Sequence, residues 1–510
     1  MRTSGVLMPI FSLPSKYGIG TLGKEAYEFI DFLKKAGQTY WQILPIGTTG
    51  FGDSPYQSFS SFAGNPYFID LQMLYENGLL ETEEIENYDW GTEPSKVDYE
   101  KIYNSRYKIL KIAYKRFKAN FENTEDYNKF IKENGFWLED YALYCAIKNS
   151  QNGASFDCWE KGYKFRHEEY IKKAKTDFAD DIDFYRFIQY CFNQQWKELK
   201  EYANKNGIYI IGDIPIYVAY DSADVWASPE EFLLDKDLKP TSVAGCPPDA
   251  FSDDGQLWGN PLYNWKYMKK NGFLWWIRRL KYCSELYDVV RIDHFRAFSA
   301  YFSIPYGDDT AVNGKWKKGP GKALFDEMKK RFGTLNIIAE DLGTIDEDVR
   351  KLLKYTNFPG MKVLQFAFQP ESESSYLPHN IIKNCVVYTG THDNDTAIGY
   401  MQDAPDKEVS FMREYLQIGE NDSFNWSLIK AAMATSADTV ILQMQDFLGL
   451  DNTARINKPS TTGQNWQWRI TQGCTNDWLA KIIRDCTKTY FRLPVSDEQK
   501  DLVDTKTEKK

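Results

Sequence analysis

Short apolar runs rich in β-branched residues recur along this chain, and most are followed by turn residues and then by a helical pattern. Such a run predicts a buried strand, and its alternation with helical segments predicts parallel strands joined by crossover helices. Eight parallel strands can close into a (β/α)8 barrel, so we predict an α/β protein of the TIM-barrel type. The predicted strands are 5–10, 39–46, 208–218, 289–295, 336–340, 361–368, 385–391 and 439–446.

The spacing of these runs is uneven and predicts insertions in the barrel. Residues 1–70 hold the first two predicted strands, and residues 201–495 hold the other six. The intervening residues 71–200 are far more than one crossover needs, and their helical spacing predicts a large, mainly α-helical inserted subdomain. Residues 219–288, rich in Pro, Gly, Asp and Trp, are predicted to form a long structured loop insertion over one face of the barrel. The charged residues 496–510 are predicted to be a frayed tail.

Composition restricts the partners of the protein. Hydrophobic residues make up 43% of the 510 residues, and the formal charge of -10 is spread along the chain, so we expect a large core and no nucleic-acid or membrane partner. No apolar stretch approaches the length that spans a bilayer. The eight cysteines have no metal-binding spacing, as expected for reduced thiols, and this predicts a cytoplasmic location. The oligomeric state is left open.

Acidic residues gather at the ends of the predicted strands. Asp213, Asp293 and Glu340 end the third, fourth and fifth runs, and His392 with Asp393 follows the seventh. Any one of these carboxylates could cap a helix or pair with an arginine. Because the loops after barrel strands build the active site, and because like charges repel, four acidic clusters at one barrel mouth favour a catalytic site.

Two of the carboxyl groups are predicted to have different pKa values. Arg291 and Asp293 stand two apart on a strand and share a face, so the guanidinium can hold Asp293 ionised as a nucleophile. Glu340 follows the apolar run from 337 to 339, and burial beside a second carboxylate would raise its pKa toward that of a general acid. Such a pair is typical of glycosidic-bond cleavage with retention of configuration.

At this point the sequence resembles the amylomaltases, which are 4-alpha-glucanotransferases of the glycoside hydrolase family 77 type. Four segments carry the resemblance, namely IIGDIPIYV, RIDHFR, IAEDLG and THDNDT. Three longer blocks extend it, namely SPYQSFSSFAGNPYFIDL, GCPPDAFSDDGQLWGNPLYNW and QDFLGLDNTARINKPSTTGQNWQWR. These landmarks run from residue 54 to residue 469, so the resemblance covers nearly the whole chain.

The resemblance implies roles for individual residues. It implies that Asp293 is the nucleophile, that Glu340 is the general acid/base, and that Asp393 stabilises the transition state. It also implies a donor-sugar site made by Arg291, Asp213 and His392, with Tyr56 stacked under the sugar ring. The implied substrates are maltooligosaccharides and α-1,4-glucans, with no cofactor and no metal ion.

Two loops are predicted to cover the barrel mouth and bind glucan. The first, residues 245–265, contributes Phe251, Gln256 and Trp258, and the second, residues 451–469, contributes Asn465 together with Asn457 and Trp466. Flat rings can cover the apolar face of a pyranose. Two residues depart from the family pattern, since Ser460 stands where glycine is usual and Cys246 where another small residue is usual.

Three alternatives stay open at the level of sequence. An α-glucan hydrolase of the α-amylase type would use the same carboxylates. An enolase-type barrel would use carboxylates after the third, fourth and fifth strands to hold Mg²⁺, although it also needs a base that the sixth run lacks. A non-catalytic glucan-binding protein would need no ordered pair of carboxyl groups.

Overall fold

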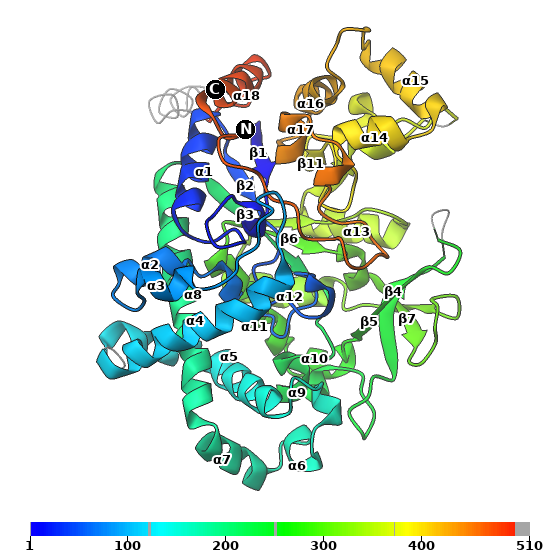
Figure 1. Ribbon diagram of the computed structural model, residues 1–510. Helices are drawn as coiled ribbons and strands as arrows, with labels where there is room; N and C mark the ends of the chain where they lie inside the picture. The colour runs from blue at the N-terminus through cyan, green and yellow to red at the C-terminus, as the bar shows by residue number, and fades with distance from the viewer. Residues whose placement is uncertain (1, 121–123, 249–251, 372, 495–510) are drawn as a thin grey trace, which may run out of the picture.

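The computed structural model describes residues 2–120, 124–248, 252–371 and 373–494, and its centre is an eight-stranded parallel sheet (Figure 1). The strand order is β10-β11-β12-β1-β2-β3-β6-β9. The backbone N–H of Ala339, on the last strand of this order, donates to the carbonyl of Pro359 just before the first strand at 2.9 Å, so the sheet closes on itself. The strands are β1 (Thr3–Leu7), β2 (Tyr40–Gln42), β3 (Tyr209–Pro215), β6 (Val289–Asp293), β9 (Ile337–Ala339), β10 (Gly360–Val363), β11 (Cys385–Tyr388) and β12 (Thr439–Gln443).

The predicted (β/α)8 barrel is therefore confirmed, and each of the eight predicted runs overlaps one barrel strand, although β1 and β10 begin before their predicted runs. The observed strands are shorter than the runs. The run 39–46, for example, holds a strand of three residues, and its remaining apolar residues continue as a buried loop at the carboxyl end. Apolar character marks burial, whereas a strand ends where its ladder of hydrogen bonds ends, so the sequence overestimates strand length.

Helices surround the barrel on its outside. Helix α1 packs against α18 and α8, which brings the last described helix beside the first strand–helix unit. The helices of this outer layer are α1 (Lys24–Lys35), α8 (Ala179–Lys205), α11 (Leu274–Leu286), α12 (Lys322–Phe332), α13 (Glu347–Thr356), α16 (Phe424–Ala434) and α18 (Asp477–Thr489). Shorter or more peripheral helices are α9 (Ala223–Ala227), α10 (Trp265–Lys270), α14 (Ala397–Asp403), α15 (Asp406–Leu416) and α17 (Met444–Leu448).

The residues between β2 and β3 are helical. Helices α4 and α5 pack against α8, and their contact is aromatic: Phe117 lies 4.8 Å from Phe187 and 5.0 Å from Tyr127 between ring centroids. Treating residues 71–200 as one subdomain remains a prediction, and the predicted tail 496–510 lies outside the described residues. The helices here, besides α8, are α2 (Leu71–Glu76), α3 (Thr82–Glu86), α4 (Tyr99–Asn120), α5 (Glu125–Ser150), α6 (Lys161–Lys164) and α7 (Glu168–Asp177).

A second, antiparallel sheet was missed by the sequence analysis, which described residues 219–288 only as a structured loop. Its strand order is β5-β4-β7-β8, and two of its strands come from beyond that loop. Its separate core is small and consists of Val243, Phe302, Ile304 and Ala311. Short strands over so small a core leave a weak apolar pattern in the sequence. The strands are β4 (Ser242–Cys246), β5 (Gln256–Pro261), β7 (Ala300–Pro305) and β8 (Lys315–Lys318).

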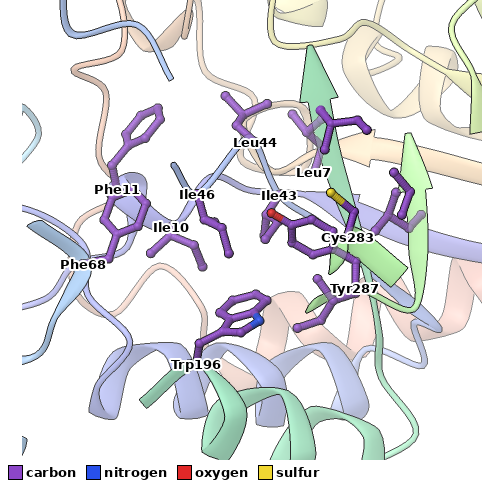
Figure 2. Packing of buried hydrophobic residues seen from close by; sticks show 14 of the residues in the cluster. Leu7, Ile10, Phe11, Ile43, Leu44, Ile46, Phe68, Trp196, Cys283 and Tyr287 are labelled. Carbon is purple, nitrogen blue, oxygen red and sulfur yellow. The ribbon is translucent and has the colours of Figure 1, made fainter. Parts of the chain in front are cut away.

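The buried loop after β2 is held from below by large apolar side chains. Figure 2 shows Ile43 beside Tyr287 and Ile46 near Trp196 of α8. The indole N–H of Trp196 donates to the carbonyl of Leu286 at 3.2 Å, which satisfies its polar atom inside this core. This packing fixes the start of the segment that later carries Tyr56 into the barrel mouth.

Arg492 ties the C-terminal helix to the amino end of the barrel. Its side chain is fully buried and donates to the carbonyls of Thr3, Met433, Thr435 and Ala437 at 2.9–3.0 Å. Burial lowers the pKa of this guanidinium to about 10, so it remains charged at neutral pH. The interaction joins β1, the end of α16 and the residues leading into β12.

We predict that Arg492→Met destabilises the protein by about 3 kcal/mol, because buried carbonyls that lose a charged donor keep their desolvation cost. Urea unfolding followed by circular dichroism measures the change. Arg484→Met is the matched control, because Arg484 is exposed on α18 and should change the unfolding free energy by less than about 0.5 kcal/mol. Equal stability of the two variants would contradict this role for Arg492.

Candidate active site

A buried guanidinium joins two carboxylates at the carboxyl ends of β3 and β6. Asp213 and Arg291 are register partners on these neighbouring strands, and Arg291 Nη1 donates to both carboxylate oxygens of Asp213 at 2.7 and 2.6 Å. Arg291 Nη2 donates to Asp293 Oδ1 at 3.0 Å. Asp213 also accepts a hydrogen bond from the hydroxyl of Tyr56 at 2.9 Å. One cation is therefore shared by two carboxylates.

Asp293 is ionised at neutral pH, although its pKa is not lowered. Burial raises the pKa of Asp293 to about 6, and the Arg291 charge opposes that rise without cancelling it. The charges of Asp213 and Asp393 act in the same direction as burial. Because Arg291 also serves Asp213, it stabilises the Asp293 anion less than a dedicated partner would.

Glu340 follows β9 directly and holds its proton more strongly. Burial, followed by the charge of Asp293, raises the pKa of Glu340 to about 8. Its two carboxyl oxygens accept backbone N–H groups of His294 at 2.6 Å and Leu342 at 2.8 Å. Since His294 is the residue after Asp293, this bond fixes Glu340 beside the end of β6. At neutral pH the site contains an ionised Asp293 and a protonated Glu340.

The segment after β11 brings His392 and Asp393 to the same mouth. His392 is buried, and its Nε2 lies 3.4 Å from Asp393 Oδ1. The ring of His392 stacks on Tyr56, with centroids 5.2 Å apart and an interplanar angle of 16°. The aromatic Trp466 lies 5.8 Å from Tyr56 and 6.0 Å from His392 between ring centroids.

Two residues of the later loop hold Asp393 in place. Asn457 donates its side-chain N–H to Asp393 Oδ1 at 2.6 Å, and Arg455 donates to the backbone carbonyl of Asp393 at 2.6 Å. Arg455 also pairs with Asp395. Asn457 was expected only as one polar residue of a glucan-covering loop, and Arg455 was missed. Arg455 could have been predicted from the sequence, because it is a charged residue in a loop that was already assigned to the barrel mouth.

These residues open into a cleft of about 640 Å³. Trp258 and Gln256 on β5 form one wall, and the indole N–H of Trp258 donates to Gln256 Oε1 at 3.0 Å. The same tryptophan packs edge-on against His294 at 4.8 Å between centroids. The cleft is lined by Tyr56, Gln256, Trp258, Asp293, His294, His392, Asp393, Asn457, Ser460 and Trp466, among others. Its size and mixed polar and aromatic lining suit a short oligosaccharide.

Not every predicted site residue lines this cleft. Asp213, Arg291 and Glu340 lie behind its surface, where they contact or face residues that do line it. The amide of Asn465 accepts from Lys458 N at 2.9 Å and donates to Thr461 O at 2.9 Å, so it closes its own loop. Phe251 lies outside the described residues. Ser460 has φ of +62°, a backbone conformation that glycine adopts with less strain. Serine in place of the glycine usual in the family therefore adds backbone strain at this position.

A (β/α)8 barrel with two carboxyl groups of unequal pKa beside a sugar-sized cleft defines an enzyme that cleaves glycosidic bonds by acid/base chemistry. The family model described as 4-alpha-glucanotransferase matches residues 8–475. The chain belongs to this family, glycoside hydrolase family 77.

Individual relatives agree with this assignment over 95% or more of their own length. A 4-alpha-glucanotransferase of Clostridium butyricum is 51% identical over 95% of this chain and 100% of its own. The 4-alpha-glucanotransferase of Thermus thermophilus is 46% identical over 92% of this chain and 95% of its own. The amylomaltase of Streptococcus agalactiae, solved in complex with acarbose, has a TM-score of 0.95 at 42% identity and covers 97% of this chain and 100% of that structure.

We predict that Asp293→Asn lowers the pKa of Glu340, because it removes the neighbouring negative charge while the burial remains. The carboxylic-acid C=O stretch of Glu340, followed by infrared titration, reports this pKa. Glu340→Gln lacks the group and identifies its band. A midpoint for Glu340 that stays the same or rises in Asp293→Asn would show that the two carboxyl groups do not interact as the structure places them.

Proposed function

We propose that this protein is a 4-alpha-glucanotransferase that moves α-1,4-glucan segments from a donor to the 4-hydroxyl of glucose or another maltooligosaccharide. The observation that carries the proposal is the pair of carboxyl groups at the barrel mouth, one ionised and one protonated at neutral pH. Retaining transfer needs this division of roles. Family membership favours the transferase over the hydrolase, the enolase-type enzyme and the non-catalytic binding protein.

In the first step, Asp293 attacks the anomeric carbon and a covalent glycosyl-enzyme forms while the glycosidic bond breaks. Glu340 gives its proton to the leaving glycosidic oxygen, which becomes the 4-hydroxyl of the released sugar. Arg291 keeps the Asp293 carboxylate oriented through its Nη2 contact. In the second step Glu340 removes the proton of the acceptor's 4-hydroxyl, and that oxygen displaces Asp293. Two displacements retain the α configuration.

Asp393 stabilises the positive charge that develops on the sugar ring during each displacement. The Asn457 amide and the backbone contact from Arg455 hold its carboxylate at the cleft surface, so little reorganisation is needed as charge develops. Tyr56, stacked on His392, presents an aromatic surface beside the same point. Asp213 acts through Arg291 and the Tyr56 hydroxyl, which places it as support for these groups.

Transfer exceeds hydrolysis only if an acceptor sugar is positioned while water is kept out. The wall formed by Trp258 and Gln256 faces the loop that carries Asn457, Ser460 and Trp466 across the cleft that all of them line. Such walls can bind the acceptor on both sides. The proposed substrates are maltooligosaccharides and α-1,4-glucans.

The proposed location is the cytoplasm. Support comes from the eight cysteines, all of which are free thiols, because disulfides are rare in a reducing compartment. Among the helices that the structure describes, none combines the length and apolarity needed to cross a bilayer.

The first test of the proposal is the product pattern from maltotriose. We predict that the enzyme forms glucose and longer maltooligosaccharides while the total of reducing ends stays nearly constant, because each bond broken is replaced by a bond formed. Chromatography of the products and a reducing-end assay measure the two quantities. A rise in reducing ends in step with glucose release would identify a hydrolase instead.

The second test is the pH dependence of kcat/KM. Asp293 must be ionised, so activity should fall as the pH drops through about 6, and Glu340 must be protonated, so activity should fall as the pH rises through about 8. We predict a bell-shaped profile with apparent limbs near these values. Glu340→Gln should lose about 10²–10⁴-fold in activity and should lack the alkaline limb. An alkaline limb that persists in this variant would remove Glu340 from the acid role.

A further inference from the structure

A second large hollow, of about 1090 Å³, is lined in part by the β7–β8 hairpin, which also contributes residues to the catalytic cleft. We call it the lysine groove. Its lining residues come from α10, β8, the start of α12 and α13; Figure 1 labels α10, α12 and α13. Seven lysines line it, in a chain whose formal charge is -10. Positive charge is therefore concentrated here against the overall balance of the protein.

Most of these lysines have no carboxylate to neutralise them. Lys266, Lys269, Lys317, Lys318 and Lys354 form no ion pair within 4.0 Å among the residues that the structure describes. The two carboxylates that line the groove are already engaged. Asp346 pairs with Arg296 at 3.1 Å, and Asp348 with Lys351 at 3.4 Å. The groove thus presents unpaired positive charge and suits an anionic ligand.

Aromatic rings stand among the lysines. Trp316 is 39% exposed and Tyr355 is 47% exposed, so part of each ring remains open. The Arg296 guanidinium lies 3.7 Å from the centroid of the Trp316 ring, and Lys322 Nζ lies 4.3 Å from that of Tyr355. These cation–π contacts hold the rings in place. Fixed rings beside free ammonium groups suit a ligand that combines apolar C–H faces with negative charge, as a phosphorylated sugar does.

One hairpin contributes residues both to this groove and to the catalytic cleft. Asp309 and Thr310, between β7 and β8, line the cleft, whereas Lys317 and Lys318 on β8 line the groove. Phe302 of β7 packs edge-on against Trp316 at 5.1 Å between centroids, which makes the hairpin a compact wall. Because the two sites share this hairpin but no lining residue, a ligand that occupies both must extend along it, as a glucan chain can.

We propose that the lysine groove binds phosphate ester groups carried by an α-glucan whose chain also occupies the catalytic cleft. The proposal rests on the proposed function, and it adds phosphorylated α-glucan to the substrates. Free lysines supply the charge, the rings supply the sugar surface, and the hairpin places the groove within reach of one chain. Nucleic acid fits less well, because a long polyanion would extend past the groove over a surface whose overall charge is negative.

The test uses the full-length Glu340→Gln protein, so that ligands are not consumed during titration. Calorimetry compares a phosphorylated maltodextrin with the same maltodextrin after phosphatase treatment. We expect the phosphorylated form to bind about tenfold more tightly at low salt, with the difference shrinking as salt is added. A second protein carries Lys269→Gln, Lys318→Gln and Lys354→Gln in addition to Glu340→Gln, which removes one unpaired charge each from α10, β8 and α13. In this protein the two maltodextrins should bind with equal affinity.

A matched control removes the same charge elsewhere. Lys108→Gln, Lys129→Gln and Lys132→Gln change exposed lysines of α4 and α5 and should keep the tenfold preference. Equal binding of the two maltodextrins by the starting protein, or loss of preference in this control, would overturn the groove assignment. Binding of inorganic phosphate or glucose 6-phosphate as tight as that of the phosphorylated glucan would also overturn the groove assignment. Failure of the dephosphorylated maltodextrin to bind at all would instead contradict the proposed function.

Discussion

The active site depends on how one buried guanidinium is divided between two carboxylates. Arg291 binds both oxygens of Asp213 and one oxygen of Asp293. Removing Arg291 would leave the buried Asp213 carboxylate without its cation, a loss that commonly costs about 3–5 kcal/mol, and would also remove the partner of Asp293 at the cleft surface. Because Arg291 is shared, the pKa of Asp293 is about 6, so Asp293 is ionised at neutral pH. Its anion is nevertheless less stabilised than it would be by an arginine that contacts no other carboxylate. This balance suits the nucleophilic role proposed for Asp293, because a strongly stabilised anion reacts slowly.

Burial raises the pKa values of both Asp293 and Glu340, and their distance from Arg291 then separates the two values. Among the described residues, Glu340 forms no hydrogen bond or ion pair with an arginine, and both burial and the Asp293 charge favour its protonated form. Its backbone partners, Leu342 N and His294 N, oppose this effect and fix the direction of the side chain. The order of proton affinities therefore follows from which group lies nearer the guanidinium.

Around this centre, the insertions of the barrel supply much of the lining of the catalytic cleft and of the lysine groove. The antiparallel sheet supplies Trp258 to the catalytic cleft through β5 and Lys318 to the lysine groove through β8. The loop from 451 to 469 supplies Asn457 and Arg455, which fix Asp393. In barrel enzymes the catalytic residues commonly lie at the ends of the strands, and the loops differ between enzymes with different substrates. In this protein the carboxylates likewise lie at strand ends, and the cleft walls come from inserted segments.

The sequence by itself determined the eight strands and the carboxylates that end them, because burial leaves a local apolar pattern and because the end of a barrel strand is a fixed place in the fold. It also indicated that Arg291 and Asp293 share a face. Only the tertiary structure decided that Arg291 is shared with Asp213, that Asn457 binds Asp393 while Asn465 closes its own loop, and that lysines from α10, β8 and α13 meet in one groove. These contacts join segments far apart in the chain, and no local periodicity records them.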